Sequence, residues 1–194
     1  MPTILLVRHG ETHSNRAKKI QGQTDSPLTL RGIEQARAYG ETIRTLIAGT
    51  RGWRVMASPL GRCMQTAAIL SEVAGLPYAV EPDPRLMEVR TGAWSGLSKS
   101  DLPGDIAAGT GLDAWYFRCP GGERWQDMAD RLGKWLSERR DGEKIVAVSH
   151  GVAGKVMRGL YAGLDPVDAL SGDSPQDAVF VLAGGRVERI ACGS

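Results

Sequence analysis

The chain has 194 residues, of which 24 are lysine or arginine and 22 are aspartate or glutamate. Its formal net charge of +2 is too small to predict a nucleic-acid partner, and its 42% hydrophobic and 24% charged contents argue against disorder and against membrane spans. Because one hydrophobic core remains workable up to roughly 250 residues, we expect a single domain over residues 1–194.

The first half of the chain alternates short apolar runs with longer segments of helical period. Residues 3–7 form a continuous run rich in strand formers, and residues 53–56 form a similar run, so both are predicted to be buried strands. Apolar residues between 33 and 47 have helical spacing after a possible N-cap at Thr29, and those between 64 and 73 repeat this spacing. We therefore predict two strands and two helices in alternation.

The second half of the chain continues this alternation and ends in a hairpin. A helix is predicted over residues 123–139, a buried strand over 144–148 and a further helix after Gly151. Two strands at 179–182 and 187–190 are expected to pair across the turn AGGR. The pattern predicts an α/β fold, a three-layer α/β/α sandwich with a mostly parallel sheet and an antiparallel edge.

Three of the predicted strand ends carry chemically useful side chains. "VRHG" ends the first strand with Arg8 and His9, "ASPLGR" follows the second with Arg62, and "VSHG" ends a later strand with His150. In sheets of this kind, ligands bind beyond the carboxyl ends of the strands, near a topological switch point. We therefore expect these four side chains to surround one crevice.

A metal site is the first alternative for this region. His9 and His13 are four residues apart with Glu11 between them, which superficially resembles the helix of a zinc protease. However, Gly10 stands where that motif has its catalytic glutamate, and a histidine at a strand end need not share a helical face with its neighbour. The chain also lacks the G-x-S-x-G pattern of a serine hydrolase. We predict no metal site and no cofactor.

Phosphoryl chemistry accounts for more of these residues at once. A phosphate monoester carries nearly two negative charges, and guanidinium groups such as those of Arg8 and Arg62 bind its oxygens in a bidentate manner. A neutral imidazole can attack phosphorus through one ring nitrogen when the other is held by a hydrogen bond, for example to a backbone carbonyl, and His9 fits that role. His150, beside helix-opening Gly151, fits a donor to a phosphoryl oxygen.

The ordered motifs identify a family resemblance. "LLVRHGETHSN" contains R-H-G-E-T-x-x-N, and S-P-x-x-R, E-x-x-x-G-x-W-x-G and S-H-G follow it in order over nearly the whole chain. In this pattern the chain resembles the histidine phosphatase superfamily, which is similar to cofactor-dependent phosphoglycerate mutase. The resemblance implies phosphoryl transfer through a phosphorylated histidine.

The resemblance also implies a role for each matching residue. His9 is implied to be the phosphorylated nucleophile and Glu88 the proton donor. The residues implied to bind the phosphoryl group are Arg8, Arg62 and His150. The residues implied to line the substrate pocket are Asn15, Gln21 and Gly22, although Asn15 also suits a helix cap.

Two departures from the family pattern bear on the reaction. Arg124 stands where many relatives have serine after P-G-G-E, and is expected either to alter the pocket wall or to face solvent. The stretch "EVRTGAWSG" lacks the basic and tyrosine-containing segment that binds a second anionic group in mutase relatives. We therefore predict hydrolysis of a phosphomonoester. A mutase is the first alternative, and a non-catalytic module that binds phosphate esters is the second.

The remaining expectations concern partners and surroundings. The expected partner is a small-molecule phosphate ester, with no nucleic acid and no membrane. Cys63, Cys119 and Cys192 have no metal or redox spacing, and the N-terminus lacks the features of a secretion signal, so we expect reduced thiols and a cytoplasmic protein. The polar, glycine-rich residues 97–111 are expected to form a surface excursion or lid, and the loop 97–115 to select the organic part of the substrate.

Overall fold

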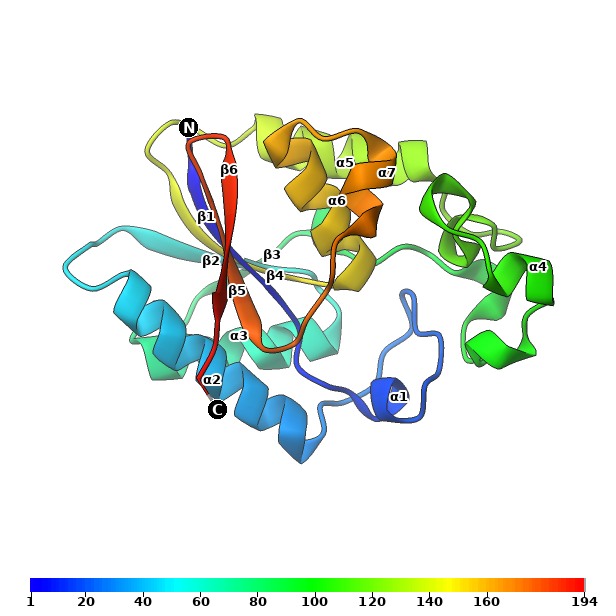
Figure 1. Ribbon diagram of the computed structural model, residues 1–194. Helices are drawn as coiled ribbons and strands as arrows, with labels where there is room; N and C mark the ends of the chain where they lie inside the picture. Colours follow the sequence, from blue (N-terminus) through cyan, green and yellow to red (C-terminus); the bar gives the residue numbers. More distant parts are fainter. Residues whose placement is uncertain (194) are drawn as a thin grey trace.

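A six-stranded sheet forms the centre of the computed structural model, which describes residues 1–193 and leaves Ser194, the last residue of the predicted domain, outside the described residues. The strands are β1 Thr3–Arg8, β2 Trp53–Ala57, β3 Val80–Pro82, β4 Lys144–Ser149, β5 Ala178–Ala183 and β6 Arg186–Ala191. Their order is β3-β2-β4-β1-β5-β6 (Figure 1). β1 to β4 are parallel, and the β5–β6 hairpin is the antiparallel edge, as predicted.

Helices cover both faces of the sheet and give the predicted three layers (Figure 1). The helices are α1 His13–Arg16, α2 Leu30–Leu46, α3 Gly61–Ala74, α4 Gly104–Ala107, α5 Trp125–Ser137, α6 Gly151–Ala162 and α7 Pro166–Ser171. Among residues 1–193, none of them is long and apolar enough to cross a bilayer.

Alternating side chains of β1 explain why its sequence is apolar throughout. Ile4 and Leu6 pack into one buried cluster with residues of α5 and α6, whereas Leu5 and Val7 pack into a second cluster with residues of α2 and α3. Successive side chains of a strand point to opposite faces, so a strand covered on both faces needs an apolar residue at every position.

The boundaries and the minor elements differ from the predictions. The helix predicted over 123–139 begins at Trp125 and ends at Ser137. β3 and α7 were not predicted. β3 is only three residues long and lies at the sheet edge, so it has no apolar run. α7 does carry a local start signal, because the Asp165 side chain accepts hydrogen bonds from the N–H groups of Val167 and Asp168.

The predicted surface excursion is a series of short helical turns rather than an open loop. It contains α4 and 3-10 turns at Lys99–Asp101, Gly111–Asp113 and Trp115–Phe117, and it projects from the sheet (green, Figure 1). Its first residues are attached to the segment after α1. The N–H of Ile20 donates to Leu97 O at 2.8 Å, and the N–H of Gly96 donates to Ile20 O at 2.8 Å.

The start of α2 packs backbone to backbone against the loop that follows β1. A Cβ atom at Gly32 would lie 2.1 Å from Glu11 O, and one at Gly10 would lie 2.2 Å from Gly32 O. Thr29 caps α2 through a 3.1 Å hydrogen bond from the N–H of Gly32, and its own N–H donates to Glu11 O at 2.9 Å. The position of the loop after His9 therefore depends on glycine at both contact points.

Gly32→Ala should disrupt this contact. We expect a loss of about 1–3 kcal/mol in the free energy of unfolding, because the added methyl group overlaps backbone atoms. Gly133→Ala is a matched control inside α5, where a Cβ atom meets nothing within 4 Å. It should stabilise the fold by about 0.5–1 kcal/mol, the helical advantage of alanine. Urea denaturation measures both changes. A Gly32→Ala variant as stable as the parent would contradict the packing described here.

Candidate active site

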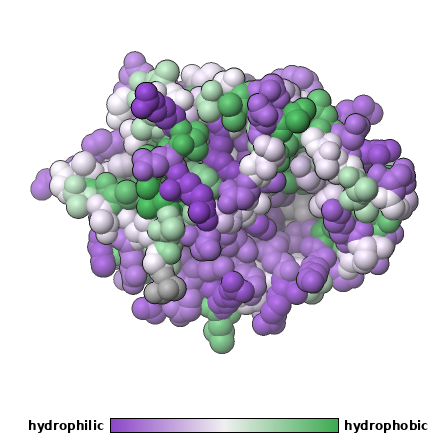
Figure 2. Space-filling model, viewed as in Figure 1, coloured by the Kyte–Doolittle hydropathy of each residue, from purple (hydrophilic) through white to green (hydrophobic). Residues whose placement is uncertain are grey.

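Most of the residues implied by the motifs line one cavity of about 310 Å³. Those that line it are Arg8, His9, Asn15, Gln21, Gly22, Arg62 and Glu88. Figure 2 shows this face hollowed between the body of the molecule and the segment that carries α4. His150 does not line the cavity, and its ring centroid lies 5.2 Å from that of His9. The cavity lies at the carboxyl end of β1, as expected.

His9 is held as a neutral imidazole with one nitrogen available. Its Nδ1 lies 2.8 Å from Gly10 O, and because a carbonyl oxygen only accepts, Nδ1 carries the proton. Nε2 therefore keeps its lone pair, and the contact with Gly10 is the one hydrogen bond of the ring among residues 1–193. Burial, followed by the charges of Arg8 and Arg62, lowers the pKa of His9 well below its ordinary value of 6.5. This is the state that a nitrogen nucleophile needs.

Two buried donors in the same cavity have no protein acceptor. Nη1 of Arg8 donates to Ser174 O at 2.7 Å, but its Nε is buried and unpaired. Nε2 of Gln21 is also buried and unpaired, although its Oε1 accepts from Asn15 Nδ2 at 3.3 Å. A buried donor without an acceptor costs roughly 1–3 kcal/mol. Two such donors beside His9 indicate a site built for an anionic ligand.

Arg62 is almost fully buried, and its donors are shared between a loop and His150. Nη1 donates to Thr24 O at 2.6 Å and Nη2 to Gly22 O at 2.7 Å. The opposite edge places Nε 3.3 Å and Nη2 3.1 Å from His150 Nδ1. Gly22 has a φ of +53°, and a Cβ atom there would lie 2.1 Å from Thr91 Oγ1, so only glycine fits beside the guanidinium.

His150 is buried at the start of α6 with both ring nitrogens engaged. Its Nδ1 accepts from Arg62, so its Nε2 carries the proton and donates to Ser58 Oγ at 2.8 Å. Burial, followed by the positive charge of Arg62, lowers the pKa of His150 well below its ordinary value. A phosphoryl oxygen therefore gains a donor from His150 only if it replaces the Arg62 contact and Nδ1 takes up a proton.

Glu88 is half-buried and is bound by the first turn of α6. Its carboxylate accepts from the N–H of Val152 at 3.1 Å and from the N–H of Ala153 at 3.0 Å. These N–H groups have no partner within the helix, so the side chain of Glu88 satisfies them. The contacts hold the carboxyl group in the wall of the cavity that contains His9.

Comparisons with known proteins show the family to which this chain is related. The sequence profile described as the histidine phosphatase superfamily (branch 1) matches residues 4–183. The chain belongs to this superfamily. It is 37% identical over 163 residues to the probable phosphoglycerate mutase GpmB of Enterobacter sp. (strain 638), covering 79% of this chain and 71% of the relative.

Two solved structures of phosphatases share this histidine phosphatase fold. A putative alpha-ribazole-5'-P phosphatase from Escherichia coli aligns with a TM-score of 0.75 and 25% identity, over 99% of this chain and 96% of that chain. The mycobacterial glucosyl-3-phosphoglycerate phosphatase, in a complex with VO3, aligns with a TM-score of 0.80 and 25% identity, over 98% and 99%. The family thus includes members named as mutases and members named as phosphatases.

Three other residues singled out in the sequence have clear positions in the structure. Asn15 both lines the cavity and completes the capping box of α1, because its N–H donates to Thr12 Oγ1 and its Oδ1 accepts from the N–H of Thr12. His13 is exposed, with Nδ1 3.0 Å from Arg16 Nη2. Arg124 is exposed and lies outside the cavity lining. Among residues 1–193, no group of three or more histidine, cysteine, aspartate or glutamate side chains is placed to hold a metal.

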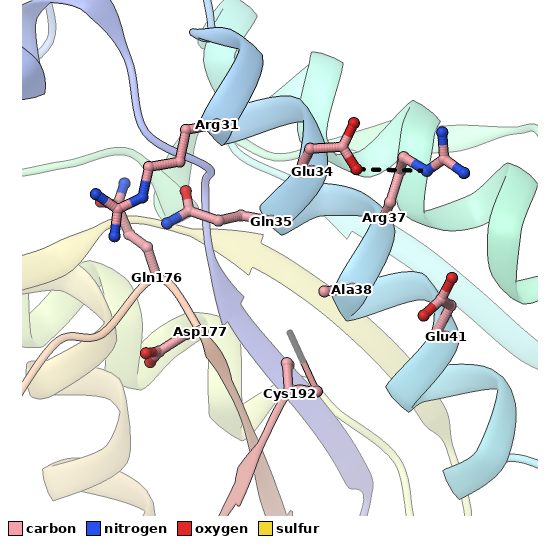
Figure 3. Close-up of a pocket in the computed structure, with 10 residues that line it drawn as sticks. Arg31, Glu34, Gln35, Arg37, Ala38, Glu41, Gln176, Asp177 and Cys192 are labelled. Carbon is pink, nitrogen blue, oxygen red and sulfur yellow. Dashed lines mark ion pairs between the residues drawn. The ribbon is translucent and has the colours of Figure 1, made fainter.

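Two glutamines that no motif contains support the loop that carries His9. Nε2 of Gln176 donates to His9 O at 2.9 Å and to Asn15 Oδ1 at 3.3 Å. Oε1 of Gln35 accepts from the N–H of Glu11 at 2.7 Å. Figure 3 shows both glutamines in a separate groove of about 490 Å³ between α2 and the end of β6. No sequence signal marks Gln176, because it is 167 residues from His9.

The lowered pKa values of the two buried histidines predict a stability that depends on pH. The unfolded chain protonates imidazoles near pH 6.5, but the folded protein does so only at lower pH. The contribution of the two neutral histidines to the free energy of unfolding is therefore fully present above pH 6.5, the ordinary imidazole pKa, and decreases as the pH falls below it. Each histidine contributes a slope of up to about 1.4 kcal/mol per pH unit.

Denaturant unfolding between pH 7 and pH 5 measures this slope. His150→Gln should reduce the slope by about half of the histidine contribution, whereas His13→Gln should leave it unchanged because His13 is exposed. Equal slopes in the parent and in the His150→Gln variant would show that His150 is not buried in its neutral form.

Proposed function

We propose that the chain is a phosphomonoesterase that hydrolyses a small phosphorylated metabolite through a phosphohistidine at His9. The observation that carries this proposal is the geometry of His9. Its Nδ1–H is held by Gly10 O, which leaves Nε2 unprotonated, and His9 lines a cavity together with Arg8 and Gln21, each of which has a buried donor without an acceptor. An imidazole in this state, next to buried guanidinium groups, suits attack on a phosphoryl group.

In the first step, Nε2 of His9 bonds to phosphorus and the ester P–O bond breaks. The leaving oxygen takes a proton from the carboxyl group of Glu88, which shares the cavity wall. Arg8 and the Nε–Nη2 edge of Arg62 neutralise the charge on the phosphoryl oxygens. The proton of a monoanionic substrate passes to Nδ1 of His150, which then donates to a phosphoryl oxygen in place of its contact with Arg62, and this proton leaves with inorganic phosphate.

In the second step, water attacks phospho-His9 and gives up a proton to the Glu88 carboxylate. The P–N bond breaks, inorganic phosphate leaves, and His9 returns to its neutral form. The backbone contacts of His9 with Ser149 O and with Gln176 keep the imidazole in place through both steps. Every proton and bond is then restored for the next cycle.

A phosphoglycerate mutase is the second candidate, because the probable mutase GpmB is 37% identical to this chain. The two activities differ only in the acceptor of the phosphoryl group on His9. Water gives inorganic phosphate, whereas a second hydroxyl of the substrate gives an isomeric ester. Phosphorus NMR of a panel of phosphomonoesters separates them, and we expect inorganic phosphate.

A covalent intermediate should be trapped during turnover. Rapid quenching in base with a labelled phosphomonoester should give label on the protein that survives base and is lost in acid, as a phosphoramidate is. His9→Ala should remove the label, and His13→Ala, a change at an exposed histidine, should retain it. Acid-stable label, or label that persists in the His9→Ala variant, means that another residue is the nucleophile. A protein that binds phosphate esters without any label or turnover is a binding module.

Glu88→Gln tests the proton donor through the leaving group. An alkoxide leaves slowly without a proton, whereas p-nitrophenolate leaves unaided, so the variant should phosphorylate His9 roughly 100-fold to 10,000-fold more slowly from alkyl phosphates. The loss should be much smaller with p-nitrophenyl phosphate. Pre-steady-state kinetics isolates the phosphorylation step. An equal loss for both leaving groups would assign Glu88 to positioning, through its contacts with Val152 and Ala153.

A further inference from the structure

Gln176 contacts the backbone of His9 although it lies outside the cavity lining. It stands just before β5 and lines the separate groove of Figure 3 instead. Its Nε2 donates two hydrogen bonds, to His9 O at 2.9 Å and to Asn15 Oδ1 at 3.3 Å. A backbone carbonyl oxygen only accepts, so the contact with His9 determines that the NH2 end of the Gln176 amide points toward the active site.

Two further amides continue this direction into the cavity. Oδ1 of Asn15 accepts from Gln176 and also from the N–H of Thr12 at 3.2 Å, so Nδ2 is the end of this amide that remains to donate. Nδ2 donates to Oε1 of Gln21 at 3.3 Å. Nε2 of Gln21, a residue that lines the cavity, is then buried without an acceptor. These three side chains form an amide chain that starts at His9 O and ends at the free donor of Gln21.

The direction of the amide chain decides whether its last member attracts or repels an anion. The NH2 and C=O ends of an amide have nearly the same size, so packing alone does not select between them. The ionised oxygens of a phosphoryl group accept hydrogen bonds from Nε2 of Gln21 but would be repelled by its Oε1. Because one NH2 group of Gln176 contacts both His9 and Asn15, it also holds the nucleophile and the donor in one relative position.

We propose that Gln176 is a positioning residue, which holds the backbone of His9 and, through the amide chain, directs the donor of Gln21 at the phosphoryl group. This inference rests on the proposed function, because it requires a phosphoryl group next to His9. The two hydrogen bonds of Gln176 have separate effects. The contact with His9 O sets the rate at which the imidazole is phosphorylated, whereas the contact with Asn15 sets the affinity for the anion.

Two substitutions at Gln176 separate hydrogen bonding from packing. Gln176→Met keeps the length of the side chain without its donor, and Gln176→Glu keeps the shape but turns an acceptor toward two oxygen atoms. We expect Gln176→Met to raise the Kd of inorganic phosphate, measured by calorimetry, roughly three- to fivefold, and to slow the phosphorylation of His9 by p-nitrophenyl phosphate roughly tenfold. Gln176→Glu should cause larger losses at neutral pH. Gln126→Met, a change of an exposed amide of α5, should alter neither quantity.

A double-mutant cycle tests whether Gln176 acts on phosphate through Gln21. Gln21→Met removes the donor at the end of the amide chain. In this background, Gln176→Met should change the Kd of inorganic phosphate by less than about 1.5-fold, because the donor that it orients is already absent. It should still slow the phosphorylation of His9, because the contact with His9 O does not pass through Gln21. A merely structural role of Gln176 would lower Tm and raise the Kd equally in both backgrounds.

The outcomes separate this inference from the proposed function. If the parent binds inorganic phosphate but hydrolyses no phosphomonoester, the proposed phosphatase activity fails, and the Kd of phosphate still tests the amide chain. If Gln176→Met and Gln176→Glu both leave this Kd unchanged, the inference is wrong. Losses of the same size with and without Gln21 also overturn it, as does a Gln176→Glu variant that matches the parent. A loss of affinity that vanishes in the Gln21→Met background, at an unchanged Tm, supports it.

Discussion

The hydrogen bond from Nδ1–H of His9 to Gly10 O is the contact on which the candidate site depends. It decides which ring nitrogen is free, and it forms only if the backbone after β1 turns directly beneath the imidazole. The start of α2 packs against that turn and holds it in place, because Gly10 and Gly32 approach too closely for any Cβ atom. Gln176 holds the carbonyl of His9 itself. Which ring nitrogen of His9 is free therefore depends on packing between segments that are distant in the sequence.

The buried guanidinium group of Arg62 needs several hydrogen-bond acceptors from the protein, because it has lost its contact with water. Arg62 is buried, but its carboxylate partner Asp25 is exposed. The guanidinium group therefore has no buried counter-charge. Carbonyl oxygens of residues 22 and 24 replace the water that its guanidinium would otherwise bind. Burial, followed by the resulting positive field, lowers the pKa values of His9 and His150. In the proposed mechanism, the same groups bind the phosphoryl group and keep His9 unprotonated.

Residues 3–7, the helical segment after Thr29 and the closing hairpin were predicted correctly because each signal is local, namely an apolar run, a cap or a glycine turn. The convergence of Arg8, His9 and Arg62 on one cavity followed from their positions at strand ends. The hydrogen bonds of His150 with Ser58 and Arg62 could not be predicted from the sequence, because they depend on side-chain directions in three different elements. Gln176 belongs to no motif, and only folding brings it to the backbone of His9.

Positive charge is concentrated in the lining of the cavity that contains His9. The chain has a net charge of only +2, and because the cavity lining carries six cationic groups and one carboxylate, the rest of the chain has more acidic than basic side chains. Many arginines outside the cavity are paired, as Arg54 is with Glu81 and Glu143 at the amino ends of the strands. Acidic side chains therefore neutralise many cations elsewhere, whereas among residues 1–193 Arg62 is the one cavity-lining cation with a carboxylate partner, the exposed Asp25, so the cavity keeps a positive charge that suits a phosphorylated ligand.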